Sequence, residues 1–182
     1  MAGACRAGCM CCCGVTPVAA DLPAAVLDWN EITAITDRLA QLIRADTCPD
    51  AVVGILRGGM VPTIRLAHVL GLRDVRALDV THTTGDGVNA VKTPRPLLRN
   101  PRSLGDMTGL DVVLVDDVAG TGETITAARS LLQAAGAASI RTAACVLNET
   151  NWRLSGGHNP AIALTYIGAR YHGWVVFPWE TR

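Results

Sequence analysis

The stretch "VVLVDDVAGTGET", residues 112–124, limits what this chain can fold into more than any other part of the sequence. Four apolar residues typical of a buried strand lead into two adjacent acids, Asp116 and Asp117, and then into a loop of small residues. A helical pattern follows from Glu123 to Gly136. A buried strand that passes through a short loop into a helix is the repeating unit of parallel α/β domains.

The rest of the chain continues this alternation. A helical pattern covers residues 28–46, where Asp28 and Glu31 have the spacing of a capping box, and a second helix is predicted at residues 62–71. Further strands are predicted at residues 51–56, 75–80, 140–147 and 161–168. The sequence therefore predicts one α/β domain, residues 26–182, in which helices flank a parallel twisted sheet.

Residues 81–109 interrupt the pattern. They show little periodicity, and glycines and prolines are scattered among polar residues. A loop of this length inside a compact domain is usually either disordered or a functional lid. Its basic residues, among them Lys92 and Arg99, fit a solvated loop as well as a loop that closes over an anion.

Composition excludes several partners. The formal net charge is zero, with 16 acidic and 16 basic residues, so no overall field attracts nucleic acid or an anionic membrane. No apolar run reaches the roughly 18 residues of a membrane span. We expect a cytoplasmic protein that has neither nucleic acid nor membrane among its partners.

Five of the seven cysteines crowd into the first 13 residues. They lack the paired spacing and downstream ligands of a zinc site, and the segment has neither the basic start nor the apolar run of a secretory signal. We interpret residues 1–25 as a disordered leader, or as residues upstream of the true start.

The acid pair and the loop after it indicate a ligand class. Ligands bind at the carboxyl ends of strands in open parallel sheets, and a small-residue loop that opens a helix offers backbone N–H groups to a phosphate. Acids beside a phosphate site suit a ligand with neighbouring hydroxyls, which is a ribose 5-phosphate. The motif lacks the Lys of a P-loop and has Ile125 where a dinucleotide-binding loop needs Gly. The remaining alternative is a plain strand-to-helix connection with N-capping residues.

These residues resemble the phosphoribosyl pyrophosphate (PRPP) motif of type I phosphoribosyltransferases, in register from about Trp29 to the C-terminus. The resemblance implies the type I fold, in which Asp116 and Asp117 bind the ribose hydroxyls and a Mg²⁺ ion, partly through water. It also implies two phosphate sites. The 5-phosphate would be held by Ala119, Gly120, Thr121, Gly122, Glu123 and Thr124, and the pyrophosphate by Arg57, Gly58 and Gly59 of "ILRGGMVP".

The C-terminal "GWVVFPWE" is similar to the small hood of bacterial and archaeal xanthine, guanine and hypoxanthine phosphoribosyltransferases. By that resemblance Trp174 stacks on the purine, and backbone groups near Val175 read its edge. Stacking on Trp tolerates any base, because every base has a π-face. The alternative is that Trp174 and Trp179 are aromatic residues of the terminal core.

Two positions depart from the 6-oxopurine enzymes. Gly120 stands where they carry the Asp that handles the purine proton, so no catalytic base is assigned, and Leu147 and Asn148 stand where a Lys would face the purine oxygen. Among the histidines, His82 and His172 could approach a ligand, whereas His68 and His158 fit structural roles.

The resemblance implies a phosphoribosyltransferase that moves ribose 5-phosphate from PRPP to a nucleobase, expected to be a 6-oxopurine, with release of pyrophosphate. A homodimer is expected because dimers are common in the family. The departures leave two alternatives open, a non-catalytic PRPP-binding regulatory module and a transferase for a different acceptor base.

Overall fold

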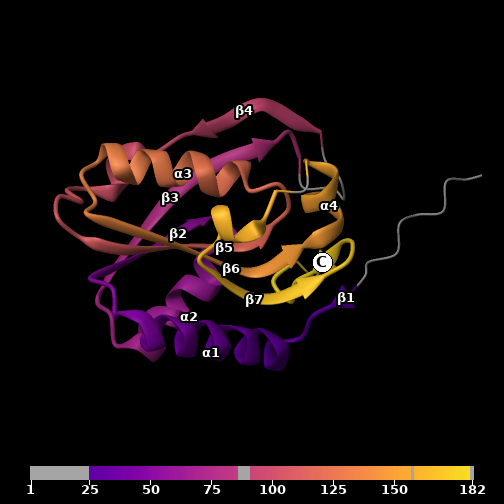
Figure 1. Cartoon of the computed structure of the whole chain (residues 1–182), viewed down its shortest axis with the longest axis horizontal. Coiled ribbons are helices and arrows are strands. Elements are labelled where there is room, and N and C mark those ends of the chain that lie inside the picture. Colours follow the sequence, from indigo (N-terminus) through magenta and orange to yellow (C-terminus); the bar gives the residue numbers. More distant parts are fainter. Residues whose placement is uncertain (1–24, 86–90, 157, 181–182) are drawn as a thin grey trace, which may run out of the picture.

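The computed structural model describes residues 25–85, 91–156 and 158–180. A six-stranded sheet has the order β4-β3-β2-β5-β6-β7, and its helices lie on both faces (Figure 1). Its strands are β2 (Ala51–Leu56), β3 (Asp74–Thr83), β4 (Lys92–Leu98), β5 (Asp111–Ala119), β6 (Ser139–Asn148) and β7 (Tyr166–Tyr171). The helices are α1 (Trp29–Asp46), α2 (Met60–Leu70), α3 (Glu123–Ala134) and α4 (Glu149–Leu154), with short 3₁₀ turns at Pro101–Leu104 and Pro160–Ile162. The predicted α/β class with a mostly parallel sheet is confirmed; the expected leader falls outside the described residues, apart from Ala25.

Two apolar clusters hold the three layers together. One contains buried residues of α1 and α2, such as Leu39 and Leu66, packed on one face of the sheet. The other contains Ile125, Ala128 and Leu132 of α3, packed on the opposite face. Helices on both faces explain why the central strands read as continuous apolar runs in the sequence.

The order of the strands reverses between β2 and β5. From β2 the chain crosses to β3 on one side, and from β5 it crosses to β6 and then β7 on the other side. β5 pairs with β2 only from Val112 to Val115, although it continues alongside β6 as far as Ala119. The carboxyl end of the sheet therefore opens at this switch point, where ligands bind in open α/β sheets.

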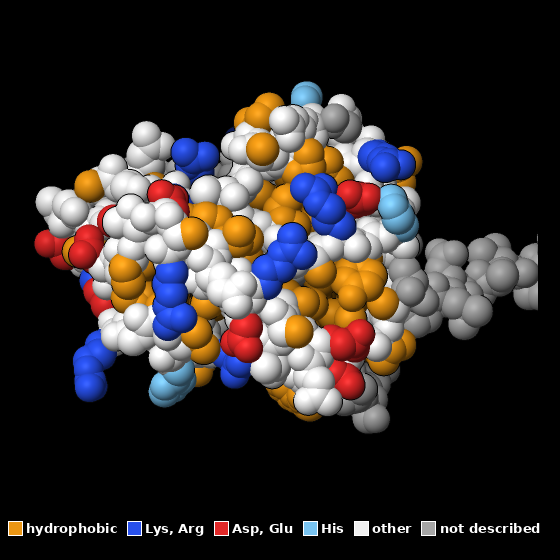
Figure 2. All heavy atoms as spheres, turned by 60° about the horizontal axis from the view of Figure 1, so that its bottom comes forward, with side chains coloured by type: hydrophobic (Ala, Val, Ile, Leu, Met, Phe, Trp, Pro, Cys, Tyr) orange, Lys and Arg blue, Asp and Glu red, His pale blue; other side chains and the backbone are white. Residues whose placement is uncertain are grey.

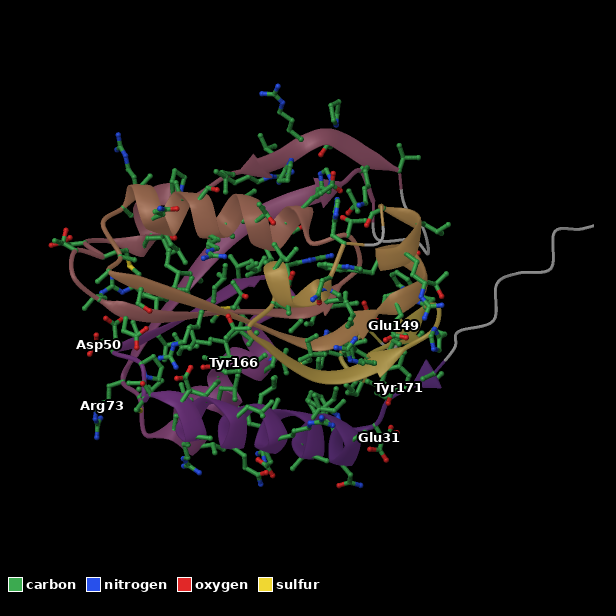
Figure 3. All side chains as sticks on the ribbon, in the orientation of Figure 1. Glu31, Asp50, Arg73, Glu149, Tyr166 and Tyr171 are labelled. Atoms are coloured by element: carbon green, nitrogen blue, oxygen red, sulfur yellow. The ribbon has the colours of Figure 1, made fainter. Side chains whose placement is uncertain are left out.

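Three labelled residues in Figure 3 show which end this is. Asp50, which precedes β2, lies at one end of the sheet. Glu149, directly after β6, and Tyr171, the last residue of β7, lie at the other end, where the parallel strands finish (Figure 3).

Both predicted helices that precede the acid pair are present. The capping box at α1 forms, because the Asp28 side chain accepts from the Glu31 N–H at 2.8 Å and the Glu31 carboxylate accepts from the Asp28 N–H at 2.7 Å. α2 ends at Gly71, whose φ of 74° is left-handed, as the sequence predicted. α2 begins at Met60, two residues earlier than the predicted start.

The prediction of an irregular loop over residues 81–109 is wrong for most of its described part. β3 continues to Thr83, and β4 pairs antiparallel with it at the edge of the sheet, with Thr81 opposite Leu97. Prolines within β4 disguised the strand in the sequence, but an edge strand tolerates proline because one side of it needs no hydrogen bonds. Leu104 and Met107 are fully buried and anchor the segment that follows.

Two boundaries near the C-terminus also differ from prediction. The strand expected at residues 161–168 begins only at Tyr166, because Pro160 starts a 3₁₀ turn in which Asn159 accepts from the Ala161 N–H. The short helix α4, capped by Asn148, was not predicted. Its six residues are too few to give a helical period.

A second, two-stranded sheet forms the hood. β1 (Ala25–Val26) pairs in parallel with β8 (Val175–Val176), so the start and the end of the described chain lie together. The face in Figure 2 mixes positive and negative side chains with small apolar areas rather than presenting one charge sign. Among the described residues, no helix has both the length and the apolar character needed to cross a bilayer.

Candidate functional site

A cleft of about 1030 Å³ opens at the switch point between β2 and β5. It is lined by residues from the end of β2, the end of β3, the middle of β5 and the hood. Its wall contains Arg57, Gly58, Asp116, Asp117, Trp174 and Glu180. The structure thus brings together the three motifs that the sequence singled out, although more than one hundred positions separate the first from the last.

Asp116 and Asp117 lie within β5 rather than at its end, because the strand continues to Ala119. Burial, reinforced by the neighbouring Asp117, raises the pKa of Asp116 well above its usual value. Burial also raises the pKa of Asp117 to about 6, and the negative charge of Glu180 adds to the shift. Two carboxylates that resist ionisation are an unfavourable arrangement in the free protein, and a cation or a set of hydroxyl donors would relieve it.

The loop after β2 passes close to these acids. A Cβ atom on Gly58 would lie 1.6 Å from the Asp117 Oδ2 atom, and one on Gly59 would lie 2.6 Å from the Ile55 carbonyl oxygen. Glycine is therefore required at both positions so that the loop can pack against β5. Arg57, the residue before Gly58, is exposed and lines the same cleft as the acid pair.

A smaller pocket of about 110 Å³ lies next to the cleft at the start of α3. Gly122 precedes the helix with a φ of 77°, and a Cβ atom there would lie 2.7 Å from the Trp152 ring. Because glycine has no side chain with which to cap α3, the first N–H groups of the helix stay available to an anion. Gly120, Thr121 and Thr124 line this pocket, and Ala119 lies at its buried base.

Glu123, which the family resemblance placed among the 5-phosphate residues, makes contacts that the sequence did not indicate. Its Oε2 atom accepts hydrogen bonds from Lys92 Nζ at 2.8 Å and from Thr121 Oγ1 at 2.8 Å, and it lies 3.1 Å from His82 Nε2. The hydrogen bond from Lys92 is the main reason why the pKa of Glu123 falls to about 2. Lys92 and His82 come from β4 and β3, so this contact ties the antiparallel edge of the sheet to the α3 loop.

The hood supplies one wall of the cleft. Trp174, Val176, Trp179 and Glu180 line it, whereas the side chain of Val175 is buried in the core. Trp179 stacks on buried Phe177 with ring centroids 4.7 Å apart, which supports the core interpretation for that residue. Trp174 is half-buried and faces the cleft.

The two departures are visible in the structure. Gly120 lies at the small pocket, and a Cβ atom there would be 3.6 Å from the Asn151 Cβ atom, so the position has room for a side chain. Leu147 is fully buried in the core, and Asn148 is buried as the cap of α4. Neither residue reaches the cleft in place of the missing Lys.

Of the two histidines that the sequence suggested could approach a ligand, the structure places one at the cleft. His82 is buried and lines both pockets, whereas His172 is exposed and pairs with Glu149 at 3.1 Å, away from the cleft. The His158 carbonyl accepts from the Trp152 indole, a structural role. Sequence analysis missed Glu180 and the contact of Lys92 with Glu123; the single lysine of the chain was a visible signal, but the pairing of β3 with β4 was needed to place it.

Two adjacent carboxylates, Asp116 and Asp117, line the cleft and could bind a metal ion. Among the described residues no group of three or more His, Cys, Asp or Glu side chains could hold a metal ion. Mg²⁺ is commonly bound through one or two carboxylates together with water and substrate phosphates rather than by a full protein cage. The pair Asp116 and Asp117 fits this mode, because it offers carboxylate oxygens next to a cleft that is open to solvent.

Comparison with known proteins gives a consistent result. Residues 24–160 match the family model described as the phosphoribosyl transferase domain. A xanthine-guanine phosphoribosyltransferase from Ruegeria sp. (strain TM1040) is 28% identical over 161 residues, which are 85% of this chain and 84% of that protein.

Two solved structures share the fold. A purine phosphoribosyltransferase from Pyrococcus horikoshii Ot3 superposes with a TM-score of 0.70 at 28% identity, covering 87% of this chain and 94% of that one. A xanthine-guanine-hypoxanthine phosphoribosyltransferase from Helicobacter pylori has a TM-score of 0.66 over 86% of this chain and 93% of its own, at 18% identity, and this likeness concerns the fold alone.

Proposed function

Because this chain belongs to the type I phosphoribosyltransferase family and is therefore a pentosyltransferase, we propose that it transfers ribose 5-phosphate from PRPP to a nucleobase and releases pyrophosphate. The observation that carries the proposal is the single cleft at the switch point, in which the acid pair, the Arg57 loop and the hood meet beside the start of α3. We assign the domain to residues 26–182.

Each group of site residues would contact a different part of PRPP. Asp116 and Asp117 hold the ribose hydroxyls, where hydrogen bonds to carboxylates fix the sugar. The loop from Ala119 to Thr124 binds the 5-phosphate through the free N–H groups of α3. Arg57, with the close backbone of Gly58 and Gly59, binds the pyrophosphate. The ribose is then held at both ends, which supports catalysis by positioning.

Mg²⁺ is the proposed cofactor, held by Asp116 and Asp117 partly through water, and when bound it supplies positive charge that stabilises the departing pyrophosphate. The raised pKa values of both acids in the free protein support this role, because a bound cation would favour their ionised form.

The proposed acceptor is a 6-oxopurine, with Trp174 stacked on the base and the backbone near Val175 reading its edge. The purine enzymes that are 28% identical to this chain support this choice. Gly120 and the buried Leu147 favour one second candidate, a different acceptor base, since both side chains that would read a 6-oxopurine are absent from the cleft. Family membership favours either enzyme over a non-catalytic module.

The wider setting follows from the same proposal. We propose a cytoplasmic homodimer that acts in nucleotide salvage and binds neither nucleic acid nor membrane. The zero formal charge and the mixed charges of the face in Figure 2 support the absence of nucleic acid as a partner. Sedimentation equilibrium tests the dimer: a single species of monomer mass would contradict it.

Product formation across a panel of bases tests the reaction. Purified protein is incubated with PRPP, Mg²⁺ and, in turn, hypoxanthine, guanine, xanthine, adenine, uracil and orotate, and nucleotide is measured by chromatography. We expect product with at least one 6-oxopurine. Product only with another base would replace the acceptor, and no product with any base would remove the proposed reaction.

Binding of PRPP tests the acid pair separately. Asp117→Ala should weaken binding of PRPP with Mg²⁺ about 10- to 100-fold in titration calorimetry, because charge-assisted hydrogen bonds of about 1.5 to 3 kcal/mol are lost. Asp37→Ala is the matched control, since Asp37 pairs with Arg65 away from the cleft. Equal affinities of the two variants would contradict the assignment.

A further inference from the structure

Lys92 and His82 line the small pocket at the start of α3, and both contact Glu123. Three donors from three parts of the chain converge on the Glu123 Oε2 atom: Lys92 Nζ at 2.8 Å, Thr121 Oγ1 at 2.8 Å and the ring of His82 at 3.1 Å. Lys92 Nζ also donates to Thr121 Oγ1 at 2.7 Å. A positive charge and two further polar hydrogens aimed at one anionic oxygen form the same arrangement that binds a phosphate oxygen.

The three donors differ from Glu123 in how firmly they are held. The side chain of His82 is 7% exposed and is fixed on β3, where its other ring nitrogen lies 3.3 Å from Thr93 Oγ1. The side chain of Glu123 is 55% exposed at the first position of α3, so it can turn into solvent without moving the backbone. An exposed ion pair such as Lys92 with Glu123 is weak and easily exchanged for another partner.

We propose that Lys92 and His82 form the second wall of the 5-phosphate site, and that the Glu123 carboxylate occupies the place of a phosphate oxygen until a sugar phosphate displaces it. The inference rests on the proposed function, which assigns the loop alone to this phosphate. It adds two residues from the antiparallel edge of the sheet and gives Glu123 the opposite role, that of an internal competitor. The pocket of about 110 Å³ that Lys92 and His82 line together with the loop before α3 is where the phosphate would bind.

A competing explanation gives Lys92 no contact with ligand. In that case Lys92 only neutralises Glu123, and the pair merely fastens β4 to the α3 loop. The two explanations differ in a Glu123→Gln background, in which no charge is left to neutralise. A phosphate-binding Lys92 still matters there, whereas a merely structural Lys92 does not.

The test uses ribose 5-phosphate as the probe in titration calorimetry, after PRPP binding by the unaltered protein has been measured. Lys92→Met should weaken ribose 5-phosphate binding about 10- to 100-fold, both alone and combined with Glu123→Gln. Glu123→Gln alone should strengthen it about 3- to 10-fold, because the competing anion is removed. Arg95→Met is the matched control, since Arg95 is exposed on the same strand and lines neither pocket; its affinity should stay within about twofold.

A second readout follows Lys92 directly. It is the only lysine of the chain, so protein labelled with ¹³C at the lysine ε-carbon gives one lysine side-chain NMR signal, which ribose 5-phosphate should shift. The inference is overturned if PRPP still binds but Lys92→Met behaves like Arg95→Met, if the Glu123→Gln background abolishes the effect of Lys92→Met, or if Glu123→Gln weakens binding. Failure of the unaltered protein to bind any phosphoribosyl compound would overturn the proposed function as well.

Discussion

Replacing Asp117 by Asn should stabilise the ligand-free protein while it weakens PRPP binding. Burial raises the pKa of Asp117 from 3.8 to about 6, so the folded protein holds this proton more tightly than the unfolded chain does. Stability contributed by such a group is lost as pH rises from about 4 to about 6 and stays lost above that range. A shift of about two pK units corresponds to about 3 kcal/mol at neutral pH.

The expected gain is smaller than that figure. Part of the Asp117 side chain still faces the solvent-filled cleft, and its amide replacement must also be satisfied there. The Val118 N–H donates to Asp117 Oδ1 at 2.8 Å, and an Asn side chain can keep this bond. We therefore expect Asp117→Asn to raise the free energy of unfolding by about 1 to 2 kcal/mol at pH 8, and by close to zero at pH 4.

Urea unfolding of both proteins between pH 4 and pH 8 measures this difference. Asp106→Asn is the control, because a hydrogen bond with Thr108 lowers the pKa of Asp106, so losing its charge should reduce stability rather than raise it. The reasoning is refuted if the difference between Asp117→Asn and the unaltered protein does not change with pH, or if it falls as pH rises.

Three further predictions concern neighbouring positions. The Gly120→Asp variant should fold normally, because the position has room for a Cβ atom. The added carboxylate should raise kcat/KM for a 6-oxopurine by up to about 10². No gain with hypoxanthine, guanine or xanthine in a folded variant would contradict the purine assignment. Gly58→Ala should lower PRPP affinity at least 10-fold in calorimetry, since its Cβ atom would overlap the Asp117 carboxylate; unchanged affinity would refute the close packing of this loop. In hydrogen exchange without ligand, the Leu97 amide on β4, which lies opposite Thr81, should be better protected than the Gly85 amide beyond the end of β3. Equally fast exchange at both positions would mean that this edge is not paired.

The sequence by itself determined the local chemistry of the site and most of the central fold. The apolar runs at β2 and β5, the capping box of α1 and Gly71 at the end of α2 are encoded within a few neighbouring residues each, so they could be read directly. Asp116 and Asp117, with the small-residue loop after them, predicted a ribose phosphate as the ligand for the same reason. Family resemblance supplied the proposed roles of the Arg57 loop and the hood, because spacing alone could not.

Only the tertiary structure decided how these pieces meet. The sequence did not predict β4, because the strand contains prolines, which are tolerated mainly at a sheet edge. The sequence does not say which strand lies at an edge, whereas the structure places β4 there. The raised pKa of Asp117 depends on burial and on the charge of Glu180, which is 63 positions away in the chain (180 − 117). The contact of Lys92 with Glu123 likewise requires β4 to lie next to the start of α3. Contacts between distant segments set burial and charge, and these quantities have no local pattern from which to predict them.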